Sequence, residues 1–289
     1  MASTAKLVVF GFLLSGTGKV WGDDFRLLVD GRPAAEAPDR PQTAIDTDHE
    51  FDGGSRVNLT ALSATQVANL AKLAKVWGFL KYHHPAVTAG QRHWDYELFR
   101  ILPRVLAAAD GVAANQAISA WIAGLGAVAA CTRCAGVDTT LQYMAASLDW
   151  LADEALLGKE LSQTLQAVYR NRNIASKTFY VSQAADAGNP IFENEPAYPN
   201  LKLPDSGYQL LALFRYWNMV QYFYPYRDVM ADDPAQARTY WDGVLRDCVK
   251  NVARTRDYER GHLAKILAGN CLRFYGPRLQ ERFPGYTAS

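Results

Sequence analysis

The sequence has no excess of charge of either sign. Thirty lysines and arginines stand against twenty-nine aspartates and glutamates, which gives a formal net charge of +1 over 289 residues. Proteins that bind nucleic acids or anionic membranes usually carry a basic excess that attracts phosphate groups. We therefore expect no nucleic-acid partner. Hydrophobic residues make up 49% of the chain and charged residues 20%, a balance typical of a folded globular protein.

Long apolar runs are also absent. The N-terminal run at residues 7–14 has eight residues, whereas an α-helix needs roughly 20 to span a bilayer. We therefore predict no permanent membrane anchor. Lys6 precedes this run, and small and polar residues follow it, as in a secretory signal peptide. We interpret residues 1–22 as such a signal and expect export to the periplasm or the extracellular space. The alternative is a buried strand at residues 7–12.

No motif of a known catalytic or metal site is present. The sequence contains no G-x-S-x-G, no H-E-x-x-H and no D-x-[DN]-x-[DN]-G, motifs that place reactive or ligating groups at fixed spacings. His83, His84 and His93 lie close together. Because adjacent side chains on a helix point in different directions, we interpret these histidines as packing or capping residues. We predict no catalytic residue, no cofactor and no bound metal for this chain.

Cysteine is scarce, with four residues in the chain. Cys131 and Cys134 form a C-x-x-C pair, whereas Cys248 and Cys271 are separated by twenty-two residues. A zinc site built from four thiolates needs a second close pair. An even number of cysteines in an exported protein favours disulfides. We predict a disulfide between Cys131 and Cys134 that fixes a loop, and the pairing of the other two cysteines stays open.

The first strongly periodic segment is predicted to be a helix with clear ends. Ser63 stands three residues before Gln66, the arrangement of an N-terminal capping box. Apolar residues then recur at steps of three and four. Pro85 disfavours the helical conformation in the residue before it. The helix is therefore expected to end near His84.

Two further helices are predicted after the first, and another later in the chain. Residues 94–109 have an apolar face, and Pro103 is expected to kink or split this helix. Residues 115–123 form the next helix, which ends at two glycines. Residues 141–170 are amphipathic. A short β-prone run at 178–181 follows, and then a loop that contains three prolines.

Part of the chain repeats itself. Trp77 recurs as Trp217 at an offset of 140 residues, and Trp94 recurs as Trp241 at an offset of 147. Leucines, tyrosines and a proline match at the same offsets. The third helical segment matches at an offset of 145, where the pairs are Ile118 and Leu263, Trp121 and Ile266, Ile122 and Leu267, and Gly124 and Gly269. The offset changes only between segments, so we predict two copies of a three-helix unit.

The predicted fold is mainly α with minor β, in which two related three-helix units are joined by an amphipathic helix and an extended proline-rich loop. Acidic residues of the loops, among them Glu193, Glu195 and Asp205, are expected to be solvated. The predicted divisions are a signal peptide at 1–22, a leader at 23–61, the first unit at 62–135, a connection at 136–206, the second unit at 207–269 and an atypical tail at 270–289.

An aromatic stripe in the second unit is the candidate binding surface. Its members are Tyr208, Trp217, Tyr222, Tyr224 and Tyr226. Flat aromatic faces with polar rims suit peptides or sugars. The competing interpretation is that the stripe belongs to the core, and we favour the core for Trp217 because it shares a helical face with apolar residues.

Several long strings resemble the N-terminal region of bacterial exported serine peptidases of the C-terminal-processing, or tail-specific, family. They are DTDHEFDGGS at residues 46–55, KVWGFLKYHHP at 75–85, WDYELF at 94–99 and GNPIFENE at 188–195. The similarity extends over about residues 46–245. After about residue 254 the sequence stops resembling the family.

The resemblance implies a larger protein in which this helical region precedes a PDZ-like module and a peptidase core. In that core a serine attacks the peptide carbonyl and a lysine acts as general base. No residue of this chain matches a catalytic position of the family. We therefore expect a noncatalytic helical region that scaffolds, or presents polypeptide substrate to, a peptidase core. The alternative is an autonomous peptide- or glycan-binding module that uses the aromatic stripe.

Overall fold

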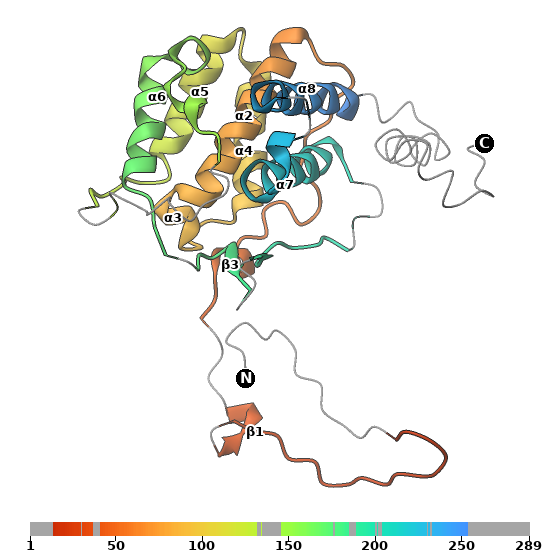
Figure 1. Cartoon of the computed structure of the whole chain (residues 1–289). Helices are drawn as coiled ribbons and strands as arrows, with labels where there is room; N and C mark the ends of the chain where they lie inside the picture. The colour runs from red at the N-terminus through yellow and green to blue at the C-terminus, as the bar shows by residue number, and fades with distance from the viewer. Residues whose placement is uncertain are drawn as a thin grey trace, which may run out of the picture. The chain divides into compact units, whose positions relative to one another are not determined.

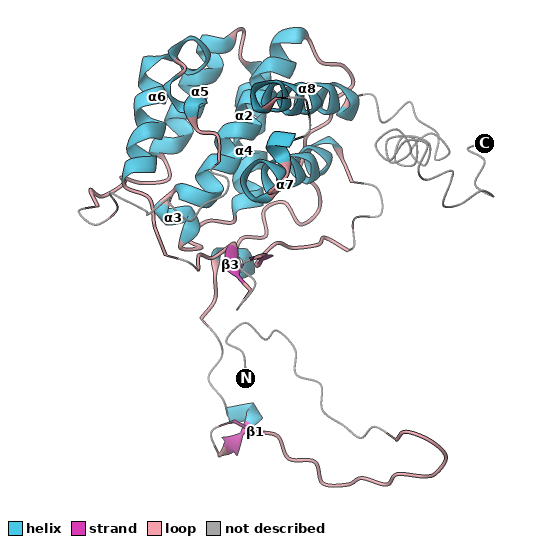
Figure 2. Cartoon of the chain, viewed as in Figure 1, coloured by secondary structure: helices cyan, strands magenta, loops and turns pink. Residues whose placement is uncertain are grey.

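The computed structural model is mainly helical, with two small sheets, which confirms the predicted fold class (Figures 1 and 2). It describes residues 14–29, 31–36, 41–131, 134, 146–175, 177–184, 189–199, 201, 204–229, 231 and 233–253. The predicted signal peptide falls largely outside these residues, and the third helix of the second unit and the atypical tail fall wholly outside them. Among the described helices, none combines the length and hydrophobicity that a bilayer crossing requires.

The chain divides into two compact units, residues Met1–Gln42 and Thr43–Ser289. In the first unit, β1 (Leu28–Val29) pairs with β2 (Arg32–Pro33) as an antiparallel hairpin, and a 3-10 turn, η1 (Ala34–Glu36), follows. Gly31 adopts a φ of 79° in the hairpin connection, a conformation that glycine reaches without steric cost.

The second unit contains the helical body. Its helices and 3-10 turns are α1 (Ala44–Thr47), α2 (Ala64–His83), α3 (Pro85–Thr88), α4 (Trp94–Ala107), α5 (Gly111–Ala123), η2 (Asp149–Ala152), α6 (Glu154–Arg170), α7 (Ser206–Phe223), η3 (Arg227–Val229) and α8 (Pro234–Val252). An antiparallel pair of strands, β3 (Val181–Gln183) and β4 (Pro190–Phe192), lies in the connection before α7.

The ends of α2 are those that the sequence predicts. The side chain of Ser63 accepts a hydrogen bond from the backbone N–H of Gln66 at 3.1 Å, and the Gln66 side chain accepts one from the Ser63 N–H at 3.0 Å. His84 has an extended conformation at the C-terminal end, with φ −73° and ψ 125°, as expected for a residue before proline.

Two helix predictions need correction. The helix α4 continues through Pro103 to Ala107, so the proline does not end it. One missing N–H is tolerated there because the buried face of α4 packs against α2 and α5. The helix α5 begins at Gly111 rather than at residue 115, because the Asp110 side chain accepts a hydrogen bond from the Ala113 N–H and caps the helix.

The two aligned helix pairs bury their tryptophans in the same way. The Trp77 and Trp94 rings stack with centroids 6.0 Å apart, and the Trp77 Nε1 donates to the Trp94 carbonyl at 3.2 Å. Trp217 and Trp241 also stack at 6.0 Å, and the Trp217 Nε1 donates to the Trp241 carbonyl at 3.0 Å. The offsets of 140 and 147 thus relate equivalent contacts as well as equivalent residues.

Ion pairs join the two copies reciprocally. Lys75 of α2 pairs with Asp242 of α8 at 2.6 Å, and Arg215 of α7 pairs with Asp95 of α4. Lys75 and Arg215 are equivalent at the offset of 140, and Asp95 and Asp242 are equivalent at 147. The cation of each copy therefore binds the aspartate of the other copy, as in an interface with twofold symmetry.

Equivalent residues also contact each other where α2 and α7 meet. The Tyr82 and Tyr222 rings lie 5.2 Å apart. Asn218 lies against Gly78, where an added Cβ would come within 1.9 Å of the Asn218 side chain. A residue that meets its own equivalent lies near a twofold axis, so the two copies are related by a local pseudo-twofold axis that passes between α2 and α7. The copies share one continuous hydrophobic core instead of forming separate domains.

The two reciprocal ion pairs are expected to contribute unequally. Asp95 is 4% exposed, whereas Asp242 is 32% exposed. R215A should therefore lower the free energy of unfolding by roughly 3 to 5 kcal/mol, because it leaves a buried carboxylate without its cation. K75A, the matched control, should cost about 1 kcal/mol. Urea unfolding followed by tryptophan fluorescence measures both values, and equal losses would contradict this assignment.

Candidate functional site

A network of buried charges holds the extended segment before α7 against the helical body. This segment begins with strand β4 and continues to Tyr198. The Lys81 ammonium, 1% exposed, pairs with the Glu195 carboxylate. It also lies 5.1 Å from the centre of the Trp77 ring and 5.0 Å from that of Tyr180. Burial lowers the pKa of Lys81, an effect that the Glu195 and Asp95 carboxylates partly oppose. Glu195 is thus a buried partner of a lysine and not the solvated loop residue that the sequence suggested.

A second part of the network lies around Asp95. Its carboxylate receives the Arg215 guanidinium and a hydrogen bond from the Tyr198 hydroxyl at 2.6 Å. The Arg215 Nη1 also donates to the Pro196 carbonyl at 3.0 Å. Burial, followed by the negative charge of Asp95, raises the pKa of Tyr198. Glu195, Pro196 and Tyr198 are therefore all fixed by side chains of α2, α4 and α7.

The segment that precedes this network is also ordered by short-range contacts. Strand β4 pairs with β3 in register, with Ile191 opposite Ser182. The Ser182 hydroxyl donates to the Glu193 carboxylate at 2.5 Å, and the Asn194 side-chain amide donates to the Phe179 carbonyl at 2.6 Å. The extended segment is therefore a rigid part of the surface.

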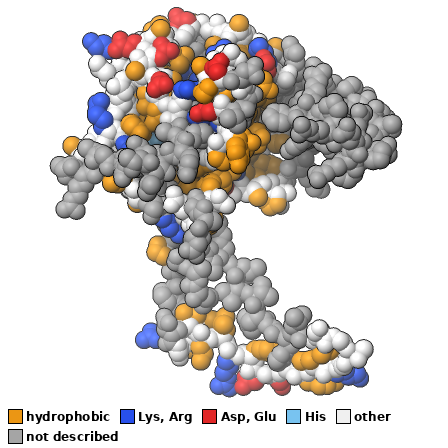
Figure 3. Space-filling model, viewed as in Figure 1, with side chains coloured by type: hydrophobic (Ala, Val, Ile, Leu, Met, Phe, Trp, Pro, Cys, Tyr) orange, Lys and Arg blue, Asp and Glu red, His pale blue; other side chains and the backbone are white. Residues whose placement is uncertain are grey.

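An apolar surface lies where this segment meets the end of α7. Phe192 packs edge-on against Phe223, with ring centroids 5.3 Å apart. Beyond Phe223, the Tyr224 and Tyr226 rings lie 5.8 Å apart and are 41% and 64% exposed. Figure 3 shows hydrophobic side chains gathered where Figure 1 draws the end of α7 and η3. We call Phe192, Phe223, Tyr224 and Tyr226 the aromatic end surface.

The aromatic stripe predicted from the sequence does not form one surface. Tyr208 is 4% exposed and donates its hydroxyl to the Phe51 carbonyl at 2.8 Å, and Trp217 is 1% exposed. Tyr222 is mostly covered by Tyr82, His83 and Phe223. Only Tyr224 and Tyr226 of the five are exposed. The two exposed tyrosines follow the end of α7 at Phe223, whereas Tyr208, Trp217 and Tyr222 lie within the helix and pack against neighbouring side chains.

Two exposed tyrosines are not among the five residues of the predicted aromatic stripe. Tyr216 on α7 and Tyr240 on α8 are 64% and 50% exposed. The sequence offered one signal for Tyr216, which lies next to Trp217 and so must point away from a face that buries the tryptophan. Nothing local marked Tyr240.

His83 and His84 pack inside the helical body. His83 stacks on Phe79 with ring centroids 4.6 Å apart, and its Nδ1 lies 2.8 Å from the Phe79 carbonyl oxygen. His84 is 1% exposed. Burial lowers the pKa of each of these two histidines to about 4. Within the part of the chain that the structure describes, no group of three His, Cys, Asp or Glu residues is arranged to hold a metal ion.

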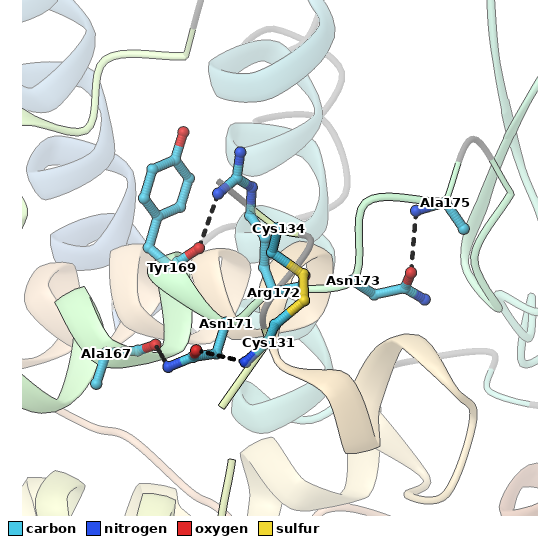
Figure 4. The surroundings of a disulfide bond; sticks show 8 residues. All are labelled: Cys131, Cys134, Ala167, Tyr169, Asn171, Arg172, Asn173 and Ala175. Carbon is cyan, nitrogen blue, oxygen red and sulfur yellow. Dashed lines mark hydrogen bonds between the residues drawn. A yellow bond between two sulfur atoms is a disulfide. The ribbon is translucent and has the colours of Figure 1, made fainter. Parts of the chain in front are cut away.

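Cys131 and Cys134 form a disulfide, shown in Figure 4. The Cys131 N–H donates to the Asn171 side chain at 2.9 Å, and the Cys134 Sγ lies 3.0 Å from the Arg172 carbonyl oxygen. These two contacts attach the disulfide-bonded loop after α5 to the end of α6. A ring closed across so few residues removes little chain entropy, equivalent to about 2 kcal/mol.

The hydroxyl groups of Ser55 and Ser162 make structural contacts. The Ser55 hydroxyl donates to the Asp205 carboxylate at 2.5 Å, and that carboxylate also accepts the Tyr208 N–H and caps α7. The Ser162 hydroxyl donates to the Leu151 carbonyl at 2.6 Å. Asp205 is therefore another acidic residue that the sequence wrongly suggested to be solvated.

A depression between α4 and α5 is lined by Arg100 and Arg104, and Arg100 is already paired with carboxylates. Arg100 lies in its wall and pairs with Asp48, Glu50 and Glu97. The Trp121 Nε1 donates to Glu97 at 2.9 Å. Three carboxylates around one guanidinium satisfy its hydrogen bonds, so we base no function on this depression.

No protein-family model, curated protein or solved structure matches this chain. The resemblance to tail-specific peptidases therefore stays a prediction from the quoted strings.

The buried histidines predict a loss of stability in mild acid. Their folded pKa of about 4 lies below the unfolded value of 6.5, so the unfolded state binds more protons and stability falls as the pH drops from 6.5 towards 4. For one imidazole this difference corresponds to roughly 3 kcal/mol.

H83F places at position 83 the residue type found at the equivalent Phe223. It should remove about half of the acid-dependent loss, measured by urea unfolding at several pH values. H49Q, which changes an exposed histidine, is the control for the loss of a histidine outside the core. An H83F protein with the pH dependence of the unsubstituted chain would refute the role of His83.

Proposed function

We propose that this chain is a noncatalytic helical region of an exported, tail-specific-peptidase-like protein, and that it presents polypeptide substrate to a peptidase core. The observation that carries the proposal is the aromatic end surface beside a rigid extended segment. Glu195 and Tyr198 fix that segment through Lys81 and Asp95. A fixed apolar surface binds a flexible chain without first having to be ordered itself.

The chemistry of the surface suits an unfolded polypeptide. Tyr224 and Tyr226 offer broad faces and hydroxyl rims, so they can contact apolar side chains and peptide groups together. No charged group is required for such binding, so recognition is expected to depend on apolar side chains of the substrate.

An autonomous binding module is the second candidate function. It rests on the same exposed tyrosines, whose faces also suit the flat, apolar faces of sugar rings. The two functions differ in their ligand and in their dependence on a peptidase core. Titration with oligosaccharides as well as peptides distinguishes them.

Peptide binding is tested by isothermal titration of the full chain with short unstructured peptides that end in apolar residues. The double variant Y224S/Y226S should bind about tenfold more weakly or worse, because both anchors are lost. Y240S changes a similarly exposed tyrosine on α8 and should bind normally. Equal affinities for the two variants, or binding of oligosaccharides alone, would contradict the proposal.

The chain by itself should not hydrolyse peptides. Incubation with unstructured peptides, followed by mass spectrometry, should give only intact peptide. Turnover that a covalent serine reagent blocks would show a catalytic site and overturn the noncatalytic part of the proposal. A chain that binds peptide and also cleaves it would leave the binding surface valid.

A further inference from the structure

The hairpin of β3 and β4 has a regular alternation of paired and unpaired backbone groups. In an antiparallel pair of strands, residues that exchange hydrogen bonds with the partner strand alternate with residues whose N–H and C=O point away from it. The Glu193 N–H donates to the Tyr180 carbonyl at 3.0 Å, and the Ala184 N–H donates to the Asn189 carbonyl at 2.8 Å. These two bonded pairs fix the alternation along the whole hairpin.

The backbone of Phe192 points to the outer edge of β4. Phe192 lies opposite Val181, one position from the bonded pair at Glu193. The outward groups of Val181 are used by a turn, because its carbonyl accepts the Thr178 N–H at 2.8 Å and its N–H donates to the Thr178 hydroxyl at 3.3 Å. Among the described residues, none makes such a hydrogen bond to the N–H or C=O of Phe192. Pro190, the next outward residue of β4, has a carbonyl and no N–H.

We propose that a polypeptide substrate binds as an additional strand along the outer edge of β4. This inference rests on the proposed function and specifies how the main chain of the substrate is held. An extended main chain presents N–H and C=O groups at every second residue, which is the spacing of Pro190 and Phe192. A sugar has no such array, and a helix already uses its backbone groups internally. The favoured occupant is therefore an extended peptide.

The added strand also decides which substrate side chain meets the aromatic end surface. Residues directly opposite each other on neighbouring strands share one face of the sheet. The substrate residue opposite Phe192 therefore lies on the face where Phe192 packs against Phe223, with ring centroids 5.3 Å apart. Its two neighbours point to the other face, that of Ile191, which is 45% exposed. We expect selection for an apolar side chain at the first position and little selection at its neighbours.

The backbone next to Phe192 is already held in place. The Glu193 carboxylate accepts the Ser182 hydroxyl at 2.5 Å and pairs with Lys177 at 3.6 Å. The Asn194 side-chain amide donates to a carbonyl at 2.6 Å on the β3 side of the hairpin. The edge consequently loses little conformational freedom when a substrate strand pairs with it.

A second copy of this chain is the competing occupant of the edge. Two copies that paired through β4 alone would meet over strands of three residues. Stable interfaces between folded proteins bury about 1,600 Å² in total, far more than such short strands provide. A flexible peptide suits a short edge better, because it can also follow the neighbouring aromatic end surface.

The test is isothermal titration of the full chain with the acetylated peptide Ala-Ser-Ala-Leu-Ala-Ser-Ala. Four variants of this peptide carry a single N-methyl group, placed on its third, fourth, fifth and sixth residues in turn. An added strand bonds to the edge through every second N–H. Two alternate methyl groups should therefore weaken binding about tenfold, and the other two should change the affinity by less than about twofold. The sensitive pair of positions, fourth and sixth or third and fifth, shows whether the strand is antiparallel or parallel.

The outcomes separate this inference from the proposed function. If the unmethylated peptide binds and all four methyl groups weaken it equally, strand addition is wrong and polypeptide binding stands. If none of the five peptides binds, both are wrong.

Amide hydrogen exchange locates the peptide on the hairpin. Saturation with the unmethylated peptide should slow exchange of the Phe192 N–H about tenfold or more. Gln183 lies opposite Pro190, so its N–H points outward from β3, and its exchange should stay as fast as in the free chain. Protection of Gln183 in place of Phe192 would contradict the assignment to β4. Protection of Phe192 that rises with protein concentration in the absence of peptide would assign the edge to a second copy and equally overturn the inference.

Discussion

The way α7 lies against α4 depends above all on the more buried of the two reciprocal ion pairs between the copies. Arg215 and Asp95 are held out of water, where a charge is costly unless an opposite charge and hydrogen bonds accompany it. Such a pair allows little variation in the way α7 lies against α4. Because Tyr198 also binds Asp95 and Glu195 lies close to Arg215, the same interaction sets the position of the extended segment. The extended segment, which carries Phe192 of the aromatic end surface, is therefore positioned by buried charges.

The local symmetry is broken where the proposed function lies. Lys81 of α2 corresponds to Gln221 of α7, so the ammonium that binds Glu195 from the first copy has no charged counterpart in the second. The extended segment is held by Lys81 of the first copy and by Arg215 of the second, and its Phe192 contacts Phe223 at the end of α7. A symmetric pair of helices cannot by itself create a single binding surface, and this one asymmetric cation selects where the surface forms. The disulfide and α6 cover the first copy in a similarly one-sided manner.

The proposed noncatalytic, polypeptide-binding function is consistent with the contacts that the polar groups make. The carboxylates of Glu195, Asp95 and Asp205 all have structural partners, and His83 and His84 are buried, with pKa values lowered by burial to about 4. What the described surface offers to a ligand is aromatic area on rigid backbone. That combination supports the proposed binding of a polypeptide.

Much of the helical architecture was readable from the sequence because its causes are local. The capping box at Ser63, the stop before Pro85 and the periodic apolar residues act within a few positions of the chain, and the repeat showed which tryptophans are buried. The candidate site was not readable in the same way. Glu195 and Asp205 look like solvated loop residues until Lys81 and Ser55, more than a hundred positions away, are brought to them. Likewise, Tyr208 and Tyr224 are alike in the sequence. Only the tertiary structure decided which of them is buried, because exposure depends on the elements that pack against a residue and not on the residue itself.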